Sequence, residues 1–196
     1  MKNSKSKLMT GVKSLCGLAL LLVTFAVTSQ AQVPIGQPWT SIGAVGTVDE
    51  GDVTFTGPIV YLEGESAVLR YNVVSVDGVL ENAGGGALTR TFLRARFRDN
   101  GDNNRVIVRL KSQGLVGANA GDITTLMTID SNDYPGSSSF QTRSIWCDGG
   151  AFSFDFVNNA YYVEVTMTRT TLPVTAGLAG IQVGRTASAC IVAPTI

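Results

Sequence analysis

Two stretches of the chain carry positively charged residues at alternate positions. In the stretch 87–98 these residues are Arg90, Arg94, Arg96 and Arg98, and in the stretch 105–112 they are Arg105, Arg109 and Lys111. The guanidinium group of arginine is a planar fork that holds a carboxylate or a phosphate through two hydrogen bonds at once. This spacing predicts a surface that binds an anionic ligand, such as an acidic polysaccharide, a lipid headgroup or a phosphate backbone.

Apolar residues fill the positions between these cations, with Leu93, Ala95 and Phe97 in the first stretch and Val106, Val108 and Leu110 in the second. Alternation with period two is typical of a strand that buries one face. A two-residue turn at Asn100-Gly101, or a four-residue loop over 100–103, would place both apolar sets on one side of a hairpin. We therefore expect a hairpin with a ladder of cations outside, and the candidate ligand-binding residues are Arg94, Arg96, Arg98, Arg105, Arg109 and Lys111.

Cations that face one another across a sheet repel by roughly 0.2–1 kcal/mol per pair, so the ladder needs anions. Neighbouring strands could supply them as ordinary ion pairs from Glu63, Asp130, Asp155 or Glu164. Asp155 and Glu164 also have a second interpretation. A hairpin from 151–157 to 160–170 would set them diagonally on one face, with about 7–8 Å between their backbones. Such a spacing is compatible with the two carboxylates of a polysaccharide hydrolase.

Other kinds of chemistry have little support in the sequence. The chain contains no histidine, which excludes Ser-His-Asp and Cys-His catalysis and metal sites with histidine ligands. No glycine loop follows a strand and opens a helix, so we expect no nucleotide. The oxygen-rich loops 99–104 and 130–133 lack the spacing of an EF-hand and are explained by turn chemistry. We predict neither a metal nor a cofactor.

Short runs of alternating or β-branched residues fill most of the chain, and clusters of Gly, Asn, Asp, Ser or Pro separate them. The predicted strands are 53–62, 67–76, 87–98, 105–112, 123–129, 140–147, 151–157, 160–170 and 178–183. The cluster Glu63-Gly64-Glu65 is expected to be a turn. Eight to nine strands at this spacing predict an all-β fold, an antiparallel β-sandwich of the jelly-roll or Ig-like kind.

The first 31 residues have the three parts of a secretory signal peptide: lysines, an apolar run over 18–27, and small residues before a cleavage site near Ala31. We therefore expect a protein that is secreted to the periplasm or the extracellular space. The predicted organisation is a signal peptide over 1–31, a leader over 32–47 and one β-sandwich domain over 48–196. The whole chain has 15 Lys and Arg against 15 Asp and Glu, and four lysines leave with the signal, so the mature net charge is −4.

Two cysteines remain after removal of the signal peptide, Cys147 and Cys190. Because an exported protein meets an oxidising environment, we expect them to form a disulfide. The competing interpretation is a pair of free, buried thiols.

These features together predict a non-catalytic secreted β-sandwich that binds an anionic ligand or polysaccharide through the arginine-rich hairpin. No later apolar run is long enough to span a membrane. Two alternatives stay open. One is a structural or adhesive subunit that self-associates through strand edges, and the other is a polysaccharide-active enzyme that depends on carboxylates.

Overall fold

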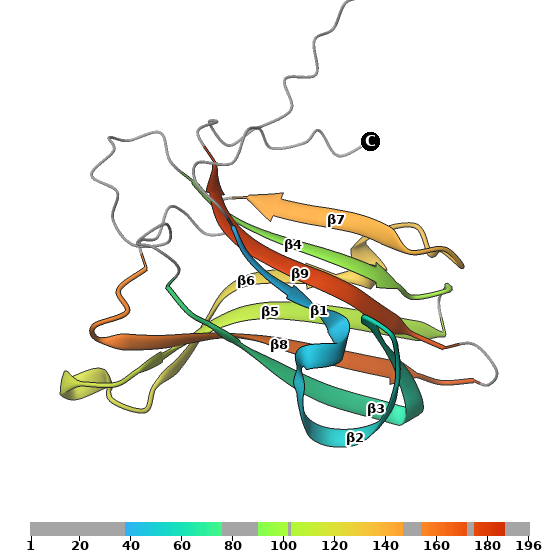
Figure 1. Cartoon of the computed structure of the whole chain (residues 1–196), viewed down its shortest axis with the longest axis horizontal. Helices are drawn as coiled ribbons and strands as arrows, with labels where there is room; N and C mark the ends of the chain where they lie inside the picture. The colour runs from blue at the N-terminus through green and yellow to red at the C-terminus, as the bar shows by residue number, and fades with distance from the viewer. Residues whose placement is uncertain (1–37, 76–89, 102, 147–153, 172–174, 187–196) are drawn as a thin grey trace, which may run out of the picture. The chain divides into compact units, whose positions relative to one another are not determined.

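The computed structural model describes residues 38–75, 90–101, 103–146, 154–171 and 175–186 (Figure 1). Nine strands lie in these ranges: β1 (Trp39–Ile42), β2 (Thr47–Thr56), β3 (Ile59–Val73), β4 (Arg90–Arg98), β5 (Asn104–Gly114), β6 (Ile123–Asp130), β7 (Gln141–Trp146), β8 (Asn159–Arg169) and β9 (Gly177–Thr186). Three short 3-10 turns accompany them, η1 (Gly43–Val45), η2 (Gly117–Asn119) and η3 (Ser131–Asp133). The predicted all-β class is confirmed.

All strand pairings are antiparallel, and the strand order is β6-β5-β8-β3-β9-β4-β7, with β1 on β9 and β2 on β3. β3 joins the two layers of the sandwich. It pairs with β8 over 66–73, but with β9 only at Val60 and Tyr61. One layer therefore contains β6, β5, β8 and β3, and the other contains β9, β4 and β7 with β1 (Figure 1).

The core lies between these layers and takes the predicted apolar faces. Leu93, Ala95 and Phe97 of β4 and Val106, Val108 and Leu110 of β5 are fully buried in one cluster. Tyr161, Val163, Val165 and Met167 of β8 join them. The period-two pattern therefore predicted correctly which side of each strand faces inward.

The predicted hairpin between 87–98 and 105–112 is wrong. β4 pairs with β9 and β7, whereas β5 pairs with β6 and β8. The segment between them crosses from one layer to the other instead of folding back in the same sheet. Asp99 anchors it, because this nearly buried carboxylate accepts a hydrogen bond of 2.9 Å from the backbone N–H of Ser137. An arch between layers buries the same alternate residues as a hairpin, so the alternation alone does not distinguish them.

The second predicted hairpin is also wrong in the residues that the structure describes. Residues 154 and 155 belong to no strand and residues 156–158 form a turn, and β8 pairs with β3 and β5. Phe154 is nevertheless buried in the core, and its ring lies 4.8 Å from that of Tyr161, centroid to centroid. Phe156 stacks on Phe154 at 5.5 Å, so an aromatic cluster takes the place of a strand pair.

Two further expectations about the N-terminal half need correction. The predicted strand 53–62 is two strands, because the chain turns at Gly57-Pro58, where Gly57 has a φ of 58°. The cluster Glu63-Gly64-Glu65 lies inside β3 and not in a turn. It forms a bulge of β3, because the register to β2 passes from Val53–Leu62 directly to Gly51–Ala67 and leaves these residues without a partner on β2. The chain continues as an extended strand through this bulge, so these residues make an irregularity within β3 and not a reversal of the chain.

The predicted leader over 32–47 contains β1 and η1. Trp39 of β1 is buried in the core, and β1 pairs with β9 from Trp39–Val183 to Ile42–Gly180. The predicted signal peptide, Cys147 and Cys190 lie outside the described residues, so these features stay predictions. Within the described ranges, no helix has the length and apolar character needed to cross a bilayer.

Candidate ligand-binding faces

The three outward-facing cations of β5 are paired with two carboxylates on neighbouring strands. The guanidinium of Arg105 holds both oxygens of Asp130 on β6, with Nε 2.9 Å from Oδ1 and 3.1 Å from Oδ2, and Nη2 also contacts Oδ2. This hydrogen bond lowers the pKa of the Asp130 carboxyl below its usual value, and it raises the pKa of Arg105. The pair behaves as an ordinary surface ion pair.

Glu164 of β8 forms ion pairs with the other two cations of β5, Arg109 and Lys111. Its Oε1 lies 3.4 Å from Nη1 of Arg109, and its Oε2 lies 2.7 Å from Nζ of Lys111. All three side chains are partly buried, so the contacts lie in a half-desolvated environment. On the outer face of β5, neighbouring strands therefore do supply the counter-ions, as one of the two interpretations of the sequence predicted.

Two of the four acids proposed as counter-ions have different contacts. Asp155 accepts hydrogen bonds from the backbone N–H groups of Val157 and Asn158 and from the Asn158 amide, and the last of these lowers the pKa of the Asp155 carboxyl. Glu63 is hydrogen-bonded to the hydroxyl of Thr54. Since the register that set Asp155 diagonal to Glu164 does not occur, the predicted pair of hydrolase carboxylates is not formed.

The outward-facing arginines of β4 have no carboxylate partner among the described residues. Arg94 donates to the hydroxyl of Ser144 (Nε–Oγ 2.9 Å) and to the amide oxygen of Gln182 (Nη1–Oε1 3.2 Å). Its guanidinium also lies 5.3 Å from the centroid of the Phe92 ring. Arg96 is exposed, and its Nη1 makes a long hydrogen bond of 3.5 Å to the Thr142 hydroxyl.

Strand order explains this difference. β4 lies between β9 and β7, so Arg94 faces Gln182 and Ser144, and Arg96 faces Gly180 and Thr142. These neighbours are an amide, two hydroxyls and a glycine. They hold the guanidinium groups in place but do not neutralise them.

A shallow groove of about 300 Å³ runs over these residues on the outer face of β1, β9, β4 and β7. Its polar lining consists of Thr40, Ser41, Arg94, Arg96, Thr142 and Gln182. Gly180 has no side chain beside Arg96, and Ile42, almost half exposed, lies across from Gly180 on β1. The groove therefore combines two cations with amide and hydroxyl groups, and none of its lining residues is acidic.

The six candidate residues thus divide into two sets. Arg105, Arg109 and Lys111 lie on the outer face of one layer and Arg94, Arg96 and Arg98 on that of the other. They do not form one ladder, and only Arg94 and Arg96 share the groove. Sequence reasoning missed Thr40, Thr142 and Gln182, although the alternation in 178–183 does place Gln182 on the polar side.

Comparison with known proteins shows no family, although it does find similar solved structures. No protein-family model and no curated protein sequence matches the chain. Among solved structures, the fold is similar to the CBM22-1 xylan-binding domain of Paenibacillus barcinonensis Xyn10C. The match covers 81% of this chain and 99% of that domain, at 9% sequence identity and a TM-score of 0.41. At this level of similarity, the function has to be argued from the residues themselves.

Proposed function

We propose that the protein is a non-catalytic binding protein for an acidic polysaccharide, and that the groove over β1, β9, β4 and β7 is its binding surface. The observation that carries this proposal is the pairing of Arg94 and Arg96 in an exposed groove whose lining residues include no acid. Each guanidinium keeps N–H donors that its protein contacts do not use.

The chemistry of the groove suits a chain of sugar acids. A guanidinium can hold a sugar carboxylate through two parallel hydrogen bonds. The hydroxyls of Thr40 and Thr142 and the amide of Gln182 can both donate and accept, as sugar hydroxyls require. The groove lies on a sheet face and is open, so an extended polymer can lie along it. We further propose that this binding takes place outside the cytoplasm, as the N-terminal sequence predicts.

The test is binding of the mature protein to polygalacturonate, measured by affinity electrophoresis, with a neutral polymer as the reference. The double variant Arg94→Gln/Arg96→Gln should weaken binding by about ten- to a hundredfold, the usual effect of losing a charge-assisted hydrogen bond. The control is Arg105→Gln/Arg109→Gln on the other layer, which should change binding by less than about threefold.

Salt provides the second arm of the test. Because the contacts are ionic and exposed, binding should weaken when salt is raised from about 0.05 to about 0.5 M, as the Debye length shrinks. Binding that ignores salt, or equal losses in both double variants, would contradict the proposal.

A further inference from the structure

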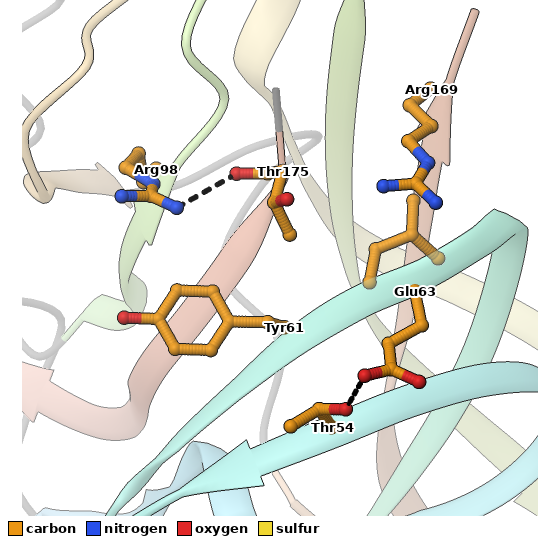
Figure 2. Close-up of a pocket in the computed structure, with 7 residues that line it drawn as sticks. Thr54, Tyr61, Glu63, Arg98, Arg169 and Thr175 are labelled. Atoms are coloured by element: carbon orange, nitrogen blue, oxygen red, sulfur yellow. Dashed lines mark hydrogen bonds between the residues drawn. The ribbon is translucent and has the colours of Figure 1, made fainter. Parts of the chain in front are cut away.

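A second concave site lies at the corner where β3 passes from one layer to the other. It is a pocket of about 570 Å³ lined by Thr54 of β2, Tyr61 and Glu63 of β3, Arg98 of β4, Arg169 of β8 and Thr175, with Leu62 at its base. Figure 2 shows Arg98 and Tyr61 on one side of this space and Arg169 and Glu63 on the other. Strands from both layers therefore contribute to one pocket.

Arg98 enters this pocket with part of its hydrogen-bonding capacity unused. Its Nη2 donates to the backbone carbonyl of Thr175 at 3.2 Å, and its guanidinium lies 5.2 Å from the Tyr61 ring and 5.7 Å from the Phe140 ring. Its Nε is buried and has no hydrogen-bond partner. Because buried donors are nearly always paired, this unpaired N–H shows that the protein contacts of Arg98 leave its guanidinium incompletely hydrogen-bonded.

Arg169 supplies a second cation from a different strand. It is the last residue of β8 and is partly buried, and its side chain makes no hydrogen bond or ion pair with the residues that the structure describes. Arg169 also lines an adjoining depression of about 340 Å³ with Glu65 and Thr170. Its guanidinium can therefore be reached from the surface.

The remaining polar groups of the pocket can bind hydroxyls. Glu63 is exposed and accepts a hydrogen bond from the Thr54 hydroxyl, so the remaining lone pairs of this carboxylate–hydroxyl pair offer acceptors for ligand hydroxyls. The carbonyl of Thr175 adds an acceptor beside Arg98. The side chains total two positive charges and one negative charge, which favours a ligand with a single negative charge.

We propose that this corner pocket binds a small polyhydroxylated carboxylate, that is, one sugar-acid unit, either free or at the end of a chain. The ligand carboxylate lies between Arg98 and Arg169, and its hydroxyls face Glu63 and Thr54. The volume is within the range of about 300–1,000 Å³ that is usual for small-molecule sites. This site is separate from the groove over β4, and its residues do not overlap with those of the groove.

The test uses the full mature protein and isothermal titration with galacturonate, with glucose and acetate as references. Galacturonate should bind, while glucose lacks the charge and acetate lacks the hydroxyls. Arg169→Gln should weaken galacturonate binding by about ten- to a hundredfold. Arg70→Gln is the matched control, because Arg70 is paired with Asp49 at 2.9 Å elsewhere on the surface, and it should leave the affinity unchanged.

Further variants separate this site from the proposed polysaccharide groove. Arg94→Gln/Arg96→Gln should leave galacturonate binding intact. In this variant, a galacturonate trimer should bind as tightly as the monomer if the pocket takes the end of a chain. The trimer should bind more weakly than the monomer if the pocket takes only free sugar acids. Glu63→Gln should reduce the preference for galacturonate over acetate. The proposal is overturned if acetate binds as tightly as galacturonate, if nothing binds, or if the groove variant abolishes binding while Arg169→Gln does not.

Discussion

Strands β4 and β5 carry the same pattern of alternating arginines, and the core of the sandwich lies between them. On β5 the neighbouring strands provide Asp130 and Glu164, so all three outward cations are paired. On β4 the neighbours provide Ser144, Gln182 and Thr142, and these uncharged partners do not balance the charge of Arg94 and Arg96. The strands beside an arginine ladder therefore decide whether its cations are paired with carboxylates or stay available to a ligand, and these strands can be distant in sequence.

The comparison requires that the two arginine sets lie on opposite sides of one core. Leu93→Ala and Leu110→Ala test this directly, because both side chains are fully buried. Each substitution should lower the free energy of unfolding by about 2–5 kcal/mol, measured by urea denaturation. The exposed controls Thr142→Ala and Thr124→Ala should change it by less than about 0.5 kcal/mol. A small loss for Leu93→Ala would show that β4 does not bury this face.

Removing the carboxylate of β8 that Arg109 and Lys111 share should make the two faces more alike. Glu164→Gln leaves Arg109 and Lys111 without their anion, so the free energy of unfolding should fall by about 1–3 kcal/mol. The variant should also bind polygalacturonate more tightly than the wild-type protein does at low salt. The control is Glu65→Gln, an exposed acid of β3. If Glu164→Gln binds polygalacturonate no more tightly than the wild-type protein, cations without an anionic partner are not sufficient to make a binding surface.

The reverse exchange adds a carboxylate to the face of β4. Gln182→Glu has nearly the same shape and places an anion where the amide oxygen now accepts from Arg94. Affinity for polygalacturonate should fall about tenfold, whereas stability should change by less than about 1 kcal/mol. Gln113→Glu on β5 is the matched control for added charge. Unchanged affinity in Gln182→Glu would place the polymer elsewhere.

The smallest expected effect is a difference in acid sensitivity. The pKa of Asp130 is held below its usual value of 3.8 by Arg105, so this pair stabilises the fold above that pH and is lost as pH falls through the lowered value. Arg105→Gln should therefore cost about 0.2–1 kcal/mol at neutral pH and nothing in strong acid, as measured by denaturation at several pH values. Arg94→Gln should show no such pH dependence, because Arg94 contacts no carboxylate among the described residues.

The sequence predicted each strand's buried side but not its partners. Burial on alternate sides is a local property, so Leu93 and Val108 were assigned to the core correctly. Pairing depends on distant segments, and an arch and a hairpin bury the same residues, so the predicted pairing of 87–98 with 105–112 failed. The candidate site divides in the same way. Arg94 and Arg96 follow from alternation, whereas Thr40, Thr142 and Gln182 come from strands that only the fold brings together.

The position of β9 bears on how the chain reaches its final form. This strand is the last that the structure describes, yet it lies in the middle of the sheet, between β3 and β4. During synthesis, β3 and β4 are made before residues 177–186 and cannot pair with β9 until these residues are present. Pairings between such distant segments form slowly. A product that stops before Gly177 would keep both edges bare and be prone to aggregate.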